Sequence, residues 1–215
     1  MTHAGVRVVR RSATAAMLAL LAIFAVGCFT ADVTLNADGS GTAEITYAVL
    51  PNAKVDAEKA RWSSPHVTLK SFTPKPNNTA VVQVAFDDVT KLSTADGFKQ
   101  VQELTRTREG DVEHIKVVIS NPRPTKDVKD DGRPGIQLTA NLPGPVKEAN
   151  RGAEVQGNRV TWHISLYEFL RVASTEVTVT YAVSGTEGAA GAPKGEAAPG
   201  AEPARKEPSE KKSGD

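Results

Sequence analysis

The chain has 215 residues and one cysteine, Cys28, whose thiol is the most reactive side chain in the sequence. A single cysteine excludes a disulfide within the chain and a metal site built from several cysteines. Three roles are open to Cys28: a buried core residue, a reactive thiol, or a point of covalent attachment. Its neighbours bear on the choice, because in LALLAIFAVGCFTADV it stands where an apolar run ends and a polar sequence begins.

The other residue types that could do chemistry form no recognisable constellation. His66, His114 and His163 are far apart in sequence, and each falls in a segment expected to be a strand. The chain contains no HExxH, no GxSxG and no glycine-rich phosphate loop. NADGSG, at 36–41, has two alternating oxygen ligands of a calcium loop but not the remaining ones, so we interpret it as a turn. We expect a non-enzymatic protein with no catalytic residue, metal or cofactor.

The N-terminal segment has the pattern of a signal peptide. Arg7, Arg10 and Arg11 precede an uncharged apolar run at 13–27. That run is shorter than the roughly 20 residues that a membrane-spanning helix needs, although a retained helix is the alternative. Removal of residues 1–27 changes the net charge from +1 to −2, leaving 23 basic and 25 acidic residues, and neither balance points to nucleic acid.

The end of this segment, Ala25-Val26-Gly27-Cys28, resembles the lipobox of bacterial lipoproteins. The resemblance implies that Ala25, Val26 and Gly27 are recognised by the signal peptidase. It also implies that the Cys28 sulfur receives a diacylglyceryl group with chains such as palmitate, and that cleavage makes Cys28 the new N-terminus. Phe29 stands where an Asp would retain a lipoprotein in the inner membrane, so the resemblance implies the outer membrane. Two or three acyl chains make such an anchor effectively permanent.

Between Asp32 and Ser184 the apolar residues alternate with polar ones, which predicts strands with one buried face. The predicted inward stripes are Ile45-Tyr47-Val49, Val82-Val84-Phe86, Ile115-Val117-Ile119, Ile136-Leu138-Ala140-Leu142, Val160-Trp162-Ile164-Leu166 and Val177-Val179-Tyr181-Val183, with weaker runs at 33–35 and 67–69. Turn residues separate them at 36–41, 76–78, 110–111 and 157–158, which indicates antiparallel hairpins.

Two segments have apolar residues at helical spacing and are predicted to be short helices, one at 52–62 and one at 96–104. The expected fold class is therefore α+β, with a mainly antiparallel curved sheet of about eight or nine strands and one or two short helices. A β-sandwich is the alternative.

The chain divides into three parts by composition. Residues 1–27 form the signal peptide, and 28–184 form the β-rich domain. The segment 185–215 is rich in Ala, Gly, Pro, Lys and Glu and contains no aromatic or large aliphatic residue. Such a segment cannot bury enough apolar surface to offset the entropy of ordering, so we predict a disordered tail.

Two segments resemble the LppM-like bacterial lipoproteins: NLPGPVKEANRGAEVQGNRVTWHISL at 141–166, and ADVTLNADGSGTAEITY, which begins shortly after Cys28. The resemblance spans roughly 28–184. It implies a sheet curved around a hydrophobic cavity, binding of a lipid or glycolipid at the cell envelope, and no catalysis. The chain departs from the family pattern at Arg151, which interrupts the turn between Asn150 and Gly152. It also departs in its polar tail, where mycobacterial members have a membrane segment.

The expected function is that of a lipid-anchored envelope protein, with its domain in the periplasm or at the cell surface. The same apolar stripes suit a ligand cavity and an ordinary filled core. Two roles therefore stay open: binding of a hydrophobic ligand such as a lipid or glycolipid, and a structural or protein-interaction module without a small ligand.

The lipobox interpretation predicts the effect of Cys28→Ser. Without the sulfur no diacylglyceryl group can be attached, so the variant should incorporate no labelled palmitate and should be released from the membrane fraction. Metabolic labelling and fractionation of the host measure both. A variant that still takes up the label would contradict the assignment of Cys28 as the anchor.

Overall fold

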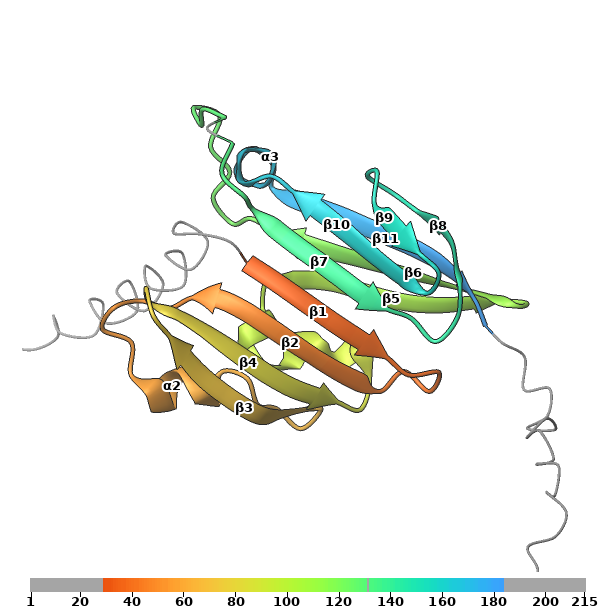
Figure 1. Ribbon diagram of the computed structural model, residues 1–215, viewed down its shortest axis with the longest axis horizontal. Coiled ribbons are helices and arrows are strands. Elements are labelled where there is room, and N and C mark those ends of the chain that lie inside the picture. The colour runs from red at the N-terminus through yellow and green to blue at the C-terminus, as the bar shows by residue number, and fades with distance from the viewer. Residues whose placement is uncertain (1–28, 131, 184–215) are drawn as a thin grey trace, which may run out of the picture. The chain divides into compact units, whose positions relative to one another are not determined.

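The computed structural model describes residues 29–130 and 132–183 (Figure 1). The predicted signal peptide at 1–27, the recognition residues Ala25, Val26 and Gly27, the anchor Cys28 and the predicted tail at 185–215 lie outside these ranges. The first described residue, Phe29, is already the start of a strand.

Strands dominate the described residues and form two sheets. The seven-stranded sheet has the order β3 (Val67–Lys75), β4 (Thr79–Phe86), β2 (Gly41–Ala48), β1 (Phe29–Leu35), β7 (Ile136–Asn141), β10 (Arg159–Ile164) and β9 (Glu154–Gln156). The four-stranded sheet has the order β5 (Val101–Glu109), β6 (Val112–Ser120), β11 (Ser174–Ala182) and β8 (Val146–Ala149). Short helices connect some of them: α2 (Val55–Ala60), α3 (Leu166–Arg171) and the 3-10 helices η1 (Val89–Thr94) and η2 (Asp96–Phe98).

The strand pairs are antiparallel apart from β1 and β7, which run in the same direction with Phe29 opposite Ile136. The predicted turns at 36–41, 76–78, 110–111 and 157–158 join successive antiparallel strands. Asn77 and Asn78 both have positive φ, as a tight hairpin turn requires, and asparagine tolerates this conformation better than most residues. The prediction of mainly antiparallel β structure is thus confirmed.

The two sheets form a sandwich-like arrangement with the apolar stripes between them. Figure 1 shows β1, β7 and β10 as one layer and β5, β6 and β11 as the other. Within the strands, the predicted stripes lie on the inner faces, because alternate residues of a strand point to opposite faces of its sheet. Leu166 was predicted to continue the stripe of β10, but it is the first residue of α3. The alternative of a β-sandwich describes the layering better than a single curved sheet does.

The predicted helix at 52–62 is present as α2, and aromatic residues fix its position. Trp62 Nε1 donates to the Tyr47 hydroxyl at 3.2 Å, and that hydroxyl donates to Glu58 of α2 at 2.7 Å. The Trp62 ring also packs edge-on against Phe98, with 5.3 Å between ring centroids. This cluster covers the inner face of β2 and β4, where Ile45 and Val82 have no exposed surface.

The predicted helix at 96–104 is wrong. The structure has the short η2 followed by β5, and the pairing of β5 with β6 shifts by one residue between Val101 and Glu103. The bulge places Val101 and Leu104 on the same inner face although they are three residues apart. A spacing of three in an isolated sequence indicates a helix, but here an irregular strand produces it.

Candidate functional site

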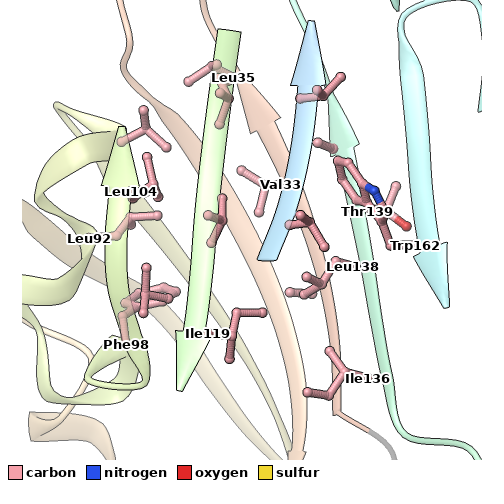
Figure 2. A pocket seen from close by; sticks show the side chains of 18 of the residues that line it. Val33, Leu35, Leu92, Phe98, Leu104, Ile119, Ile136, Leu138, Thr139 and Trp162 are labelled. Carbon is pink, nitrogen blue, oxygen red and sulfur yellow. The ribbon is translucent and has the colours of Figure 1, made fainter. Parts of the chain in front are cut away.

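An apolar cavity of about 150 Å³ lies between the two sheets (Figure 2). One wall comes from β1, β7 and β10 and the other from β5, β6 and β11, while η1 and η2 contribute side chains between them. The lining residues are Phe29, Ala31, Val33, Leu35, Val89, Leu92, Gly97, Phe98, Gln100, Val101, Leu104, Ile115, Val117, Ile119, Ile136, Leu138, Thr139, Ala140, Leu142, Trp162, Val177 and Val179.

The cavity follows the whole length of β1. Alternate residues of this strand, from Phe29 to Leu35, line it, and the neighbouring β7 adds its own alternate residues from Ile136 onward. Seven residues of extended chain cover about 20 Å at roughly 3.3 Å per residue. The lining is therefore extended along β1, while the space itself, at about 150 Å³, has room for a short apolar segment.

Several inward-facing side chains beside the cavity are only half-buried, namely Val33, Leu138, Ala140 and Val117. A filled core would bury them completely, as the core does with Ile45 of the same sheet, which has no exposed surface. Solvent-sized space thus lies against the apolar stripes of β1, β7 and β6. The two sheets do not close on one another along this part of the sandwich.

The lining offers few polar groups to bind or activate a polar substrate. The Thr139 hydroxyl lies 3.2 Å from the Thr161 hydroxyl and is hydrogen-bonded to it. Trp162 Nε1 is buried and has no hydrogen-bond partner among the described residues. With so few donors and acceptors, the cavity can hold apolar groups through hydrophobic burial and dispersion, which need no directional contacts.

A buried ionic network seals the end of the cavity next to Leu35. Arg106 of β5 donates from Nε and Nη2 to Glu113 of β6, at 2.6 and 3.0 Å, and the Tyr181 hydroxyl of β11 also donates to Glu113. Arg106 Nη2 further donates to the Ala37 carbonyl at 2.6 Å, in the turn between β1 and β2. Gly39 leaves room for the guanidinium, because a Cβ there would lie 2.5 Å from Arg106 Nη1. The Arg106 side chain therefore connects the two sheets.

The ionised form of Glu113 is favoured in this setting. Burial opposes its charge, but the hydrogen bonds from Arg106 and Tyr181 and the nearby guanidinium outweigh burial, so the pKa of Glu113 lies below its ordinary value. Burial and the bond to Glu113 raise the pKa of Tyr181 to about 12, so its hydroxyl stays a donor at neutral pH. The network is thus a charge pair with its hydrogen bonds satisfied.

The opposite end of the cavity, at Phe29, has no such seal in the described residues. Phe29, Gln100 and Val101 line this end and are all half-buried. At the sealed end, by contrast, Leu35, Leu142 and Val179 are buried. Figure 2 shows the same axis, with Ile136, Ile119 and Phe98 toward one end and Leu35 toward the other. The cavity is therefore closed at the end of β1 and only partly closed at its beginning, where Ile136, Ile119 and Phe98 are buried but Phe29, Gln100 and Val101 are half-buried. This partly closed end is called the open end.

The structure does not bring the histidines together. His66 is paired with Asp87, His114 with the Thr180 hydroxyl at 2.8 Å, and His163 lies 3.6 Å from Glu154. The NADGSG segment is the β1–β2 turn, in which Asp38 accepts from the backbone and hydroxyl of Ser40. Among residues 29–130 and 132–183, no group of three His, Cys, Asp or Glu residues could hold a metal ion.

In residues 29–130 and 132–183, no helix combines the length and the apolar character that crossing a membrane requires. Comparison with known proteins adds no further assignment: no family model matches the chain, and no curated protein sequence matches it. The resemblance to the LppM-like lipoproteins therefore stays a prediction.

The alternating apolar stripes predict most of the cavity lining, but not the ionic network that seals it. Ile136, Leu138, Trp162 and Val179 belong to predicted inward stripes. The signal for the seal was a charged residue at an inward position: Glu113 continues the stripe of Ile115, Val117 and Ile119 with a carboxylate. A charge on an apolar face requires a partner, but the sequence does not say which of many arginines supplies it.

The network predicts a pH-dependent loss of stability in Glu113→Gln. Glutamine can still accept a hydrogen bond but carries no charge, so Arg106 is left partly buried without its counter-charge, which should cost about 3 kcal/mol of unfolding free energy at pH 7. The pKa of Glu113 is lower in the folded state than its ordinary value of 4.5. Its contribution to the free energy of unfolding is therefore complete at pH values above 4.5, and it is lost as the pH falls through the folded-state pKa. The difference from wild type should therefore shrink in acid. Urea denaturation at pH 7 and below pH 4 measures it.

Glu109→Gln is the matched control for this experiment. Glu109 is largely exposed and lies 3.9 Å from His114, so its replacement should change stability by less than about 0.5 kcal/mol. An equal loss in both variants would refute the special role of the buried network.

Proposed function

We propose that this protein is a non-enzymatic, lipid-anchored component of the bacterial envelope, and that its β-rich domain binds a hydrophobic ligand such as a lipid or glycolipid in the cavity between the sheets. The half-buried apolar side chains along β1 and β7 carry this proposal. An accessible apolar space favours ligand binding over a purely structural role, for which a packed interior suffices.

The size of the cavity limits what it holds. An engineered apolar cavity of about 150 Å³ in another protein binds benzene, and the present one has a similar volume. It therefore encloses a segment of one hydrocarbon chain, while a headgroup or a second chain stays outside. Burying roughly five methylenes at about 0.8 kcal/mol each contributes about 4 kcal/mol, which by itself corresponds to a millimolar dissociation constant.

The lipobox supplies the second part of the proposal. Acylation at Cys28 anchors the domain in a membrane, with Phe29 after the cysteine favouring the outer membrane and the domain lying in the periplasm or at the cell surface. A weak site becomes occupied when its ligand is concentrated around it, and a bilayer is a concentrated source of acyl chains. The resemblance to LppM-like proteins, with their sheet curved around a cavity, supports the same proposal.

A pair of variants on β7 tests binding. Leu138 faces the cavity, whereas its neighbour Gln137 is exposed on the other side of the sheet. Leu138→Trp adds volume where space exists and should weaken the binding of added fatty acid at least fivefold. Gln137→Trp introduces the same side chain outside the cavity and should leave the affinity unchanged. Titration of the full-length protein with a short-chain fatty acid at millimolar concentration, followed by the NMR shifts of the lining methyl groups, provides the measurement.

Three controls make the result decisive. Both variants should keep a cooperative thermal transition, which shows that Leu138→Trp acts by filling the cavity and not by unfolding. Added fatty acid should raise the melting temperature of wild type and Gln137→Trp more than that of Leu138→Trp. No saturable binding by wild type, with no thermal shift on adding fatty acid or membrane lipids, would reject ligand binding and leave the role of an interaction module.

A further inference from the structure

The folded domain begins at the residue next to the predicted anchor, which restricts its orientation at a membrane. Phe29 is the first residue of β1, and its N–H donates to the Gly135 carbonyl at 3.1 Å. It also pairs with Ile136 of β7. Consecutive Cα atoms are about 3.8 Å apart, so no flexible linker separates a lipid on Cys28 from the sheet. A lipid on Cys28 would therefore hold the beginning of β1 at the membrane surface.

The same end of the domain is the open end of the cavity. Phe29, Gln100 and Val101 are the half-buried residues at that end, and the Arg106–Glu113–Tyr181 network closes the other. Given the length of β1, the sealed end lies about 20 Å further from the anchor. With a lipid on Cys28, the open end would therefore face the membrane and the polar end would face water.

Exposed apolar side chains also lie at this end. Val172 is 39 % exposed and lies just before β11. The first residue of β11, Ser174, pairs with Ser120, and the Ser120 N–H donates to the Gln100 carbonyl at 2.8 Å. These contacts place Val172 at the same end of the domain as Gln100. Val55 at the start of α2 is 46 % exposed. Figure 1 shows the start of β1, α2 and α3 at the same end of the sandwich. They are single side chains on separate elements, and Val155 of β9 is equally exposed, so the orientation follows from the position of Phe29 and not from them.

We infer that the cavity is loaded directly from the bilayer, by one acyl chain of a membrane phospholipid entering at the Phe29 end. This inference rests on the proposed function and adds the source of the ligand, the entrance and the orientation of the domain. Entry at the membrane surface spares the chain a passage through water, which costs about 0.8 kcal/mol for each exposed methylene. Entry from the bilayer is also consistent with a binding site that is too weak to bind lipid from dilute solution.

Orientation is tested with two single-cysteine labels on the full-length acylated protein. Acylation blocks the Cys28 sulfur, so an introduced cysteine is the one free thiol. Val172→Cys places an NBD label at the open end, and Ala37→Cys places it in the exposed turn next to the seal. In vesicles of phosphatidylethanolamine and phosphatidylglycerol with doxyl-labelled phosphatidylcholine, the label at 172 should lose at least half of its fluorescence and the label at 37 less than a tenth.

Loading is tested in vesicles containing phosphatidylcholine with a diazirine near the end of one acyl chain. After irradiation, peptide mapping should find cross-links at lining positions such as Val33, Val117 and Leu138, and far fewer in the Leu138→Trp variant. A photoreactive lipid delivered in detergent micelles gives the comparison that separates entry from binding.

The outcomes are distinguishable. Strong quenching at 37 in place of 172 overturns the orientation, while lining cross-links would still support ligand binding. Cross-links from micelles but none from vesicles overturn loading from the bilayer and leave the proposed function standing. The same pattern of cross-links is expected if an acyl chain on Cys28 itself fills the cavity in the membrane. No lining cross-links from either source reject both the inference and the proposed function.

Discussion

Arg106 makes the contact on which the spacing of the two sheets depends. Its guanidinium neutralises Glu113 inside the four-stranded sheet and binds the Ala37 carbonyl at the end of β1 in the seven-stranded sheet. A buried carboxylate without a partner would be strongly destabilising, so Glu113, Arg106 and Tyr181 have to stay together. Since Arg106 reaches across to Ala37, that requirement also fixes the distance between the sheets at this end.

Away from this contact, packing differs between the two halves of the seven-stranded sheet. The inner face of β2 and β4 is covered by η1, η2 and the cluster of Tyr47, Trp62 and Phe98, and its side chains are buried. Beside β1 and β7 the opposing sheet does not make full contact, and Val33 and Leu138 stay half-buried. The cavity is thus the region between a polar seal at one end and an aromatic cluster at the side.

The geometry and the weakness of the site are related. In the proposed function, a space of about 150 Å³ would hold a short stretch of one chain and contribute only a few kcal/mol. Such a site would work where acyl chains are abundant, and the proposed lipid anchor at Cys28, one residue before β1, would hold the domain there. In this account the anchor is a condition for occupancy of the cavity as well as a means of localisation.

Much of the fold could be predicted from alternation alone. The stripes at Ile115-Val117-Ile119 and Ile136-Leu138-Ala140 identified strands and their inner faces, because the period of two follows from strand geometry. The bulge in β5 could not be predicted, since its spacing of three imitates a helix. The cavity was also beyond prediction: the same stripe can be half-exposed or filled, and long-range packing decides which. The partner of Glu113 depends on the pairing of β5 with β6, which no local pattern specifies.

The most direct test of the central claim is an isotope-filtered NOE measurement on methyl-labelled full-length protein with an added fatty acid. An accessible cavity along β1 and β7 predicts contacts between the chain methylenes and the methyl groups of Val33, Leu138 and Val117. It predicts none to Val81 on the outer face of β4, where alternation places it opposite the buried Val82. Equal contacts on both faces, or no contact to the lining at saturating ligand, would contradict the account.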